Sequence, residues 1–177
     1  MSELVRLLDG STFVIRPMEP WDRATVRDGF GALSPASLRL RFFSPVPRLT
    51  AGLVADLTTV EPARRVVLLA LDPRTGHLAG EARAIRSRDD PTVADLAVTV
   101  ADDLQRRGLG TALVRSVRRA ARAQGVERLA GHVLVDNAGA RAMLRAAGAV
   151  LEFDEPGVLR FELPLVRRAP VAVGAAA

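Results

Sequence analysis

Residues 94–124, ADLAVTVADDLQRRGLGTALVRSVRRAARAQ, predict a strand, a turn and a helix in direct succession. From Ala94 to Val100 the residues alternate, which places Asp95, Ala97 and Thr99 on one face of the predicted strand. From Gly110 to Gln124 apolar residues recur at helical spacing and arginines fill the opposite side. The turn between them leads into the N-terminus of a long helix and reads Gln105-Arg106-Arg107-Gly108-Leu109-Gly110-Thr111.

This turn has the features of a phosphate-binding site. Gly108 and Gly110 lack Cβ atoms, so backbone N–H groups at the start of the helix can approach a phosphate closely. The helix dipole favours an anion there, and Arg106 and Arg107 add positive charge. Glycines also occur at helix starts that bind nothing, so the pattern alone leaves an ordinary turn open.

The flanking sequence predicts a strand-rich chain with two strand–helix units in its second half. Before the turn we expect a hairpin of residues 4–8 and 12–16 around Asp9-Gly10, helices at 21–33, 34–40 and 51–57, and strands at 65–71 and 77–85. After it we expect a strand at 129–135, a helix at 137–147 and a strand pair at 150–153 and 158–163. We predict one domain over residues 1–165 and a flexible tail over residues 166–177.

Composition narrows the possible functions. The 177 residues are 49% hydrophobic, contain no cysteine and include only two histidines. Disulfides and thiolate chemistry are therefore excluded, and we expect no metal site. No stretch reaches the roughly 18 apolar residues of a membrane helix, and the N-terminus lacks the pattern of a signal peptide. We expect a cytoplasmic protein without a membrane partner.

The positive charge is concentrated around the turn. All 25 basic residues are arginine, and residues 104–128 carry seven of them against one glutamate within a net charge of only +5. A localised polyanion fits this distribution better than a nucleic-acid duplex, which is usually met by a broad basic surface. We therefore expect no nucleic-acid partner. On the helix, Arg115, Arg118, Arg119 and Arg122 are expected on the solvated face.

The turn and its surroundings resemble the GNAT superfamily of N-acetyltransferases. The family turn is Gln or Arg, two variable residues, Gly, one residue, then Gly or Ala, and residues 105–110 fit it fully. The segments at residues 8–12, 15–17, 33–35 and 41–45 are similar to segments of the acetyltransferase domain of bacterial protein-lysine acetyltransferases. The resemblance implies an α+β fold of three layers, with a mixed, mostly antiparallel twisted sheet of six to seven strands flanked by helices.

The resemblance also implies acetyl-CoA as the cosubstrate and assigns its contacts. Members hold its pyrophosphate on the turn, which here is Gln105, Arg106, Arg107, Gly108, Leu109, Gly110 and Thr111. A downstream asparagine, here Asn137, contacts the pantetheine arm, although Asn137 also fits a simple helix cap. A backbone N–H where the strand separates from its neighbour polarises the thioester carbonyl, near Val98, Thr99 and Val100. Members are frequently dimers, which makes a homodimer possible.

The reaction requires a base, because an amine attacks only after its ammonium form loses a proton. Asp95 is the first candidate, since the similar lysine acetyltransferases place a glutamate at this position. Aspartate is one methylene shorter, which favours a bridging water. Glu81, on the preceding strand, is the second candidate, and either acid also fits a solvated or arginine-paired carboxylate. We expect His132 to pack in the core.

The leading hypothesis is an N-acetyltransferase that joins acetyl-CoA and a primary amine in a ternary complex. The acceptor is a protein lysine, a small-molecule amine or an amino acid. Many members use a tyrosine as general acid, and Leu144 occupies that position in a chain without any tyrosine. The alternative is therefore a non-catalytic acyl-CoA-binding or regulatory module.

Overall fold

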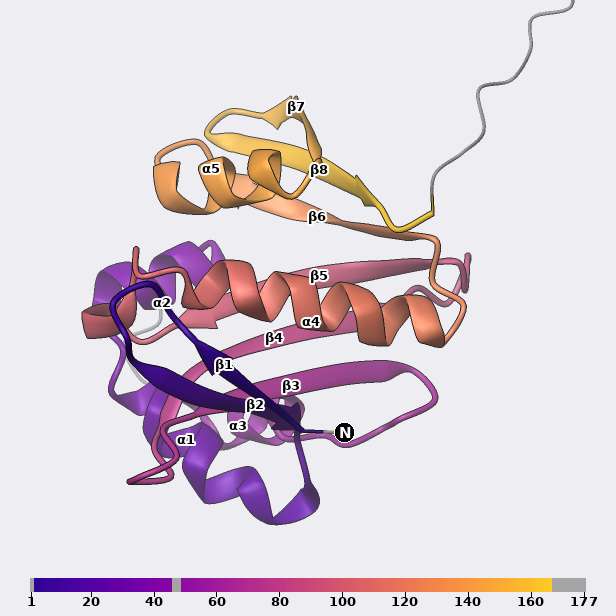
Figure 1. Cartoon of the computed structure of the whole chain (residues 1–177). Coiled ribbons are helices and arrows are strands. Elements are labelled where there is room, and N and C mark those ends of the chain that lie inside the picture. Colours follow the sequence, from indigo (N-terminus) through magenta and orange to yellow (C-terminus); the bar gives the residue numbers. More distant parts are fainter. Residues whose placement is uncertain (1, 46–48, 167–177) are drawn as a thin grey trace, which may run out of the picture.

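The computed structural model describes residues 2–45 and 49–166 and contains one eight-stranded sheet (Figure 1). The strand order is β1-β2-β3-β4-β5-β6-β8-β7, and β5 and β6 form the parallel pair in an otherwise antiparallel sheet. The expected tail lies outside the described residues from position 167 onward. The strands are β1 (Glu3–Arg6), β2 (Thr12–Pro17), β3 (Arg65–Leu71), β4 (Leu78–Arg86), β5 (Val93–Val100), β6 (Arg128–Leu134), β7 (Val150–Glu155) and β8 (Val158–Pro164).

The mixed, mostly antiparallel sheet is confirmed, with one strand more than the predicted six to seven. The lower number came from the family resemblance, whereas the sequence pattern itself indicated strands near both edges, where β1 pairs with β2 and β7 pairs with β8.

The helices lie where the sequence predicts them, with shifted ends. They are α1 (Arg23–Gly31), α2 (Pro35–Phe42), α3 (Ala51–Leu57), α4 (Leu109–Ala123) and α5 (Ala138–Ala146), with 3-10 turns η1 (Pro20–Asp22) and η2 (Asp102–Leu104). The helix expected from residue 21 begins as η1, where Pro20 starts the turn and Asp22 accepts a hydrogen bond from the Glu19 N–H at 2.8 Å. Ser34 and Thr50 cap α2 and α3 through their side-chain oxygens.

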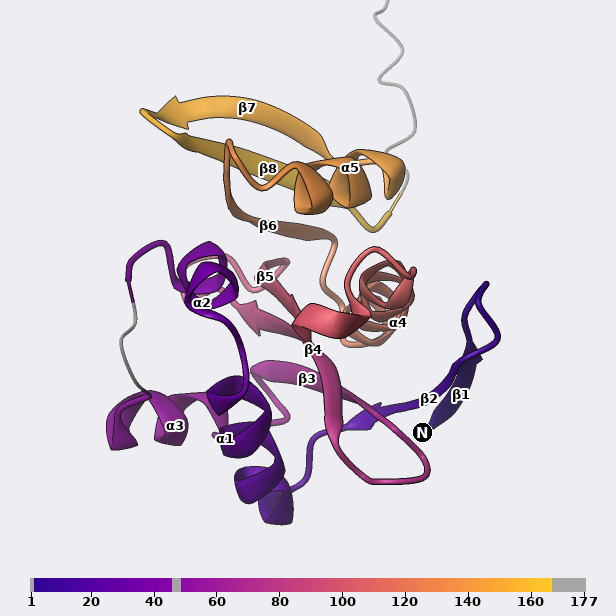
Figure 2. The same ribbon diagram turned by 90° about the vertical axis from the view of Figure 1, so that its left-hand side faces the viewer.

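The helices form two layers, one on each face of the sheet (Figure 2). On one face, α4 and α5 enclose a core that includes Leu113, Val117 and Leu144. On the other face, α1, α2 and α3 enclose a second core that includes Phe30 and Leu57. The three-layer arrangement predicted from the sequence is therefore confirmed.

The sheet opens between β5 and β6. These strands pair only from Val93–Asp95 to Arg128–Ala130, and beyond that point they separate (Figure 1). Gly131 follows the last pair, and a Cβ there would lie 3.2 Å from the Leu96 carbonyl oxygen and 3.0 Å from the Phe161 ring. A glycine therefore permits the close approach at which the strands part.

In the part of the chain that the structure describes, no helix has the length and apolarity needed to cross a membrane.

Candidate functional site

The turn between β5 and α4 has the conformation expected of an anion site. Arg106 and Gly108 both have positive φ, 58° and 95°, and Gly108 is the N-cap of the 15-residue α4. No side chain caps this end, so the N–H groups of Leu109, Gly110 and Thr111 have no capping partner. Three uncapped N–H groups and the helix dipole make this end electropositive.

The two arginines of the turn differ in their surroundings. The Arg107 Nε lies 2.5 Å from an Asp9 carboxylate oxygen in the β1–β2 turn, whereas Arg106 is exposed and pairs with no acid of the described residues. Hydrogen bonds from the Ser11 side chain and backbone, then from Arg107, lower the pKa of Asp9 to about 2. Part of the Arg107 charge is therefore neutralised at neutral pH, which the sequence pattern did not indicate.

The other side chains of the turn attach it to α2. Gln105 Nε2 donates to the Val100 carbonyl oxygen at 3.2 Å and to the Ser37 hydroxyl at 3.0 Å. The Asp102 carboxylate accepts from the Ser34 N–H at 2.9 Å, the Ser34 hydroxyl at 2.7 Å and the Ser37 hydroxyl at 2.6 Å. Burial alone would raise the pKa of Asp102, but these hydrogen bonds outweigh it and lower the pKa. The start of α2 is thus fixed to the turn.

The opposite side of the opening carries Asn137. Its side-chain oxygen accepts from the Ala140 N–H at 3.1 Å and caps α5, so the capping interpretation is confirmed. The preceding Asp136 forms an ion pair with Arg39 of α2 at 2.5 Å. Helix α2 therefore contacts both sides of the opening, the turn through Ser37 and the start of α5 through Arg39.

The free edge of β5 offers backbone donors toward the opening. The Ala101 N–H donates to the Ala79 carbonyl oxygen of the antiparallel neighbour β4. This hydrogen bond shows which residues of β5 direct their N–H groups toward β4. Because bonded positions alternate, the N–H groups of Val98 and Val100 point away from β4. The Thr99 N–H points toward β4 instead. Of the three residues expected to polarise a carbonyl, two therefore have suitably directed N–H groups.

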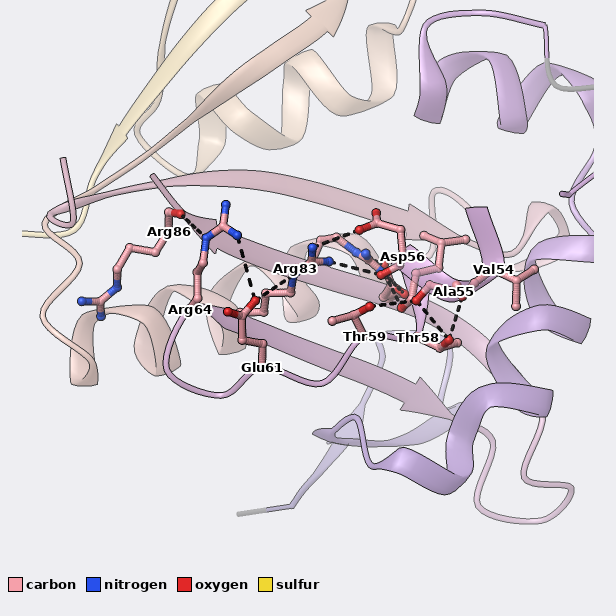
Figure 3. Close-up of polar contacts among 12 residues, drawn as sticks. Val54, Ala55, Asp56, Thr58, Thr59, Glu61, Arg64, Arg83 and Arg86 are labelled. Atoms are coloured by element: carbon pink, nitrogen blue, oxygen red, sulfur yellow. Dashed lines mark hydrogen bonds and ion pairs between the residues drawn. The ribbon is translucent and has the colours of Figure 1, made fainter. Parts of the chain in front are cut away.

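The two candidate bases have opposite environments. Asp95 is exposed and stands at the last position of β5 that pairs with β6. Glu81 is 1% exposed and is bound by Arg83 through two hydrogen bonds of 2.7 Å. Arg83 also donates to the Leu57 carbonyl oxygen at 3.0 Å, beside the polar contacts at the end of α3 in Figure 3. Glu81 is thus the buried partner of an arginine.

A second guanidinium lies near this pair. Burial is the main cause that lowers the pKa of Arg41 to about 10, and the charge of Glu81 partly opposes the shift. Among the described residues the Arg41 Nε has no hydrogen-bond partner, and its guanidinium carbon lies 5.0 Å from the Phe42 ring centre. Glu81 therefore binds one guanidinium group, and its charge acts on a second.

His132 differs from its expected position. It is exposed on β6, and its Nε2 lies 3.1 Å from an Asp154 carboxylate oxygen. The prediction of a core histidine is wrong because Leu129 and Val133 are the buried residues of β6, which turns His132 to the other face. The same alternation was visible in the sequence, but Asp154 lies on a different strand and could not be assigned as a partner.

The arginines of α4 lie mainly on its solvated side, as predicted, and several bind neighbours. Arg119 and Ser116 donate to the Glu3 carboxylate of β1, and the hydrogen bond from Arg119 is the main cause that lowers the pKa of Glu3. Arg118 donates to the Ala147 carbonyl oxygen at 2.9 Å. These contacts attach α4 to β1 and to the end of α5.

The comparisons with known proteins agree with this geometry. Residues 36–149 match the model of the Acetyltransferase (GNAT) family. Acetyltransferase Pat of Mycolicibacterium smegmatis is 32% identical over 159 residues, which are 90% of this chain, and the chain spans about half, 47%, of that relative's length.

Two solved structures are similar over most of the chain. The GNAT domain of S. lividans PAT has a TM-score of 0.86 and 30% identity, over 92% of this chain and 96% of that one. The yncA protein of Salmonella typhimurium, solved with its cofactor acetyl-CoA, has the same fold at 18% identity, with a TM-score of 0.72 over 90% of this chain and 97% of that one. On the family match, and with this fold and turn, the chain belongs to the GNAT family of acetyltransferases.

Proposed function

We propose that this protein is an N-acetyltransferase that transfers the acetyl group of acetyl-CoA to a primary amine. The observation that carries the proposal is the uncapped start of α4 beside the opening between β5 and β6. This arrangement offers an anion site and, next to it, a free strand edge along which an extended arm can pair.

The described residues fit acetyl-CoA in three places. The N–H groups of Leu109, Gly110 and Thr111 suit the pyrophosphate, and the exposed Arg106 adds charge beside them. Gly110 faces α5, since a Cβ there would lie 3.1 Å from the Met143 sulfur. The pantetheine arm would run between the edge of β5 and the start of α5, where the Asn137 amide nitrogen is a donor.

The reacting carbonyl would lie beside β5, where the N–H groups of Val98 and Val100 are directed into the opening and can stabilise a developing oxyanion. The acceptor ammonium would lose its proton to Asp95, through a water that compensates for the short side chain. The amine nitrogen then attacks the thioester carbon, and coenzyme A leaves as a thiolate. A thiolate can leave unprotonated because the pKa of a thiol is about 8.5.

We place a protein lysine first among the acceptors, because the relatives include Acetyltransferase Pat and the GNAT domain of S. lividans PAT. Small amines and free amino acids stay in the acceptor panel, since fold alone does not determine the substrate.

Thiol release on mixing the protein, acetyl-CoA and this panel tests the proposal. We expect release with at least one acceptor. Asp95→Asn should lower kcat at least ten-fold, whereas Asp89→Asn, an exposed acid in the β4–β5 turn, should not change it. Failure of calorimetry to detect coenzyme A binding at millimolar concentration would overturn both the reaction and the site.

The second candidate is a non-catalytic acyl-CoA-binding module. It is favoured by Leu144, which is 3% exposed in the α4 core and leaves no side-chain acid at the tyrosine position of the family. This candidate requires coenzyme A binding without thiol release for any amine. Gly108→Ala tests where coenzyme A binds, because a left-handed alanine strains the turn and should weaken coenzyme A binding about ten-fold, while Gly31→Ala in α1 should leave it unchanged.

A further inference from the structure

We propose that His132 and Asp154 form a second proton-accepting pair beside Asp95, and that the proton which Asp95 draws through water from the acceptor ammonium is passed on to His132. The inference rests on the proposed function and names a group that acts in the same reaction.

His132 lies on the same face of the sheet as Asp95. Asp95 pairs in register with Ala130 of β6, and His132 is the next residue on that face, about 7 Å further along the strand. This direction leads into the opening, because pairing between β5 and β6 ends at Asp95 and Ala130. An amine that approaches the free edge of β5 would therefore pass between Asp95 and His132.

The imidazole is accessible and oriented. The side chain of His132 is 51% exposed, and its Nε2 lies 3.1 Å from the Asp154 carboxylate. With the carboxylate beside Nε2, Nδ1 is the ring nitrogen that is left to accept a proton. The same logic orients the histidine of hydrolase triads.

The surroundings of the pair are mainly acidic. Arg160 of β8 is opposite His132 in register, and it is bound by Glu152 of β7 at 3.3 Å and by Glu162 of its own strand at 3.6 Å. Its repulsion of an imidazolium is therefore largely offset. The charged groups that β5, β6, β7 and β8 carry on this side of the sheet, and those at the adjoining end of α2, are Asp95, Arg128, Glu152, Asp154, Arg160, Glu162, Arg39 and Asp136.

The chemistry favours an imidazole over a carboxylate in this role. A lysine ammonium has a pKa of about 10.4, an imidazole about 6.5 and an aspartic acid about 3.9. Proton transfer from an ammonium to an imidazole therefore costs less free energy than transfer to a carboxylate. Of the other two candidate acids, Glu81 is held by Arg83 and Asp95 is short. A histidine beside Asp95 supplies a more basic group to which the proton can pass.

The proposed transfer releases two protons from the amine nitrogen and one sulfur leaving group. One ammonium proton moves through water and Asp95 to His132 Nδ1, and the freed electron pair of the amine nitrogen forms the bond to the thioester carbon. The carbon–sulfur bond breaks, and its electrons leave on the sulfur of coenzyme A. The second nitrogen proton passes through water to that thiolate, which yields the amide and the thiol, and His132 then returns its proton to solvent.

The test measures thiol release by the full chain between pH 5.5 and 9, with the best acceptor of the panel. We expect His132→Gln to lower kcat at pH 7 at least ten-fold, to leave the KM for acetyl-CoA unchanged and to remove the rise of kcat/KM near neutral pH. Asp154→Asn should lower kcat less. Glu155→Gln is the matched control, because this exposed acid is on the same strand and forms no ion pair within the described residues.

A second measurement separates a chemical role from a structural one. His132→Ala should regain part of its rate when free imidazole is added, while coenzyme A binding by calorimetry equals that of the unaltered protein. If His132→Gln keeps its rate within two-fold and retains the neutral rise, the inference is wrong although the proposed function stands. If the unaltered protein releases no thiol with any acceptor, both fail.

Discussion

At the scale of single residues, Glu81 and Asp95 show how burial separates two acids that look alike in sequence. Both lie on central strands and face the same side of the sheet, yet one is enclosed with Arg83 and the other is exposed. Removal of one partner of a buried ion pair leaves the other charge without compensation, which is strongly destabilising. Neutralising the two acids should therefore change the free energy of unfolding by different amounts.

We expect Glu81→Gln to lower the free energy of unfolding by about 3–5 kcal/mol, because Arg83 and Arg41 would lose their shared carboxylate. Asp95→Asn should change it by less than about 0.5 kcal/mol, as is usual for an exposed site. Urea denaturation of the two variants checks this. Equal effects would contradict the structural assignment of Glu81.

Asp9 provides a test that depends on pH. Its pKa is about 2 in the folded protein against an ordinary value of 3.8, so its ionised form stabilises the β1–β2 turn above pH 4. This contribution should be lost as the pH falls from about 4 to about 2. Ser11→Ala should raise the pKa of Asp9 more than Arg107→Ala does, because the Ser11 hydroxyl makes the largest contribution. NMR titration of the Asp9 carboxyl carbon measures both shifts, and the reverse order would refute the assignment.

The candidate residues could be placed on their strands, turns and helices from the sequence, but their partners could not. The positions of Asp95, Gly108 and Asn137 follow from local patterns, because strand alternation, a glycine turn and a helix cap involve neighbouring residues. The Arg107–Asp9 pair joins residues about 100 positions apart, and no local pattern predicts it. The outward position of His132 could have been predicted, since alternation with Leu129 and Val133 requires it.

At the scale of elements, α2 joins the turn to the start of α5. Its N-terminus depends on Asp102, which accepts three hydrogen bonds from Ser34 and Ser37. The sequence predicted α2 from Ser34-Pro35, but its attachment spans 68 residues and depends on how β5 is placed. Neighbouring residues are enough to predict this helix, but its contacts with the turn and with the start of α5 depend on residues far away in the sequence.

We expect Asp102→Ala to speed hydrogen exchange in the first turn of α2 about ten-fold, because that turn loses charge-assisted hydrogen bonds. The KM for the acceptor should rise more than the KM for acetyl-CoA if α2 borders the acceptor site. Asp103→Ala, an exposed neighbour in the same 3-10 turn, is the control. No change in exchange would show that α2 is held mainly by its apolar contacts.

At the scale of the whole molecule, β6, β8 and β7 join the rest of the sheet through one short ladder. Strands β5 and β6 share three register pairs, and Arg118–Ala147 and Arg39–Asp136 add two polar links. The sequence predicted the order of elements well, because their hydrophobic periods are clear. The family resemblance placed the separation of β5 from its neighbour near Val98 to Val100, whereas the pairing with β6 already ends at Asp95 and Ala130.

A ligand that fills the opening should therefore stabilise the molecule as a whole. At 100 times its Kd, coenzyme A should add about 2.7 kcal/mol to the free energy of unfolding, which is roughly a 5–10 °C rise in Tm for a domain of this size. Hydrogen exchange should slow on both sides of the opening, in β5 and in α5. Pantetheine, which lacks the pyrophosphate, should give a much smaller rise at equal concentration, and an equal rise would place binding away from the turn.

A chain whose only strongly basic side chains are arginines is suited to bind a reactive thioester. Every basic side chain in the 177 residues other than the two histidines is a guanidinium, including Arg39 and Arg107 beside the site. A guanidinium stays protonated and delocalised at any physiological pH, so it is not a nucleophile toward a thioester, whereas a lysine amine is. These 177 residues thus surround an activated acyl donor with positive charge that is inert to it, and no lysine of their own competes with the acceptor by self-acetylation.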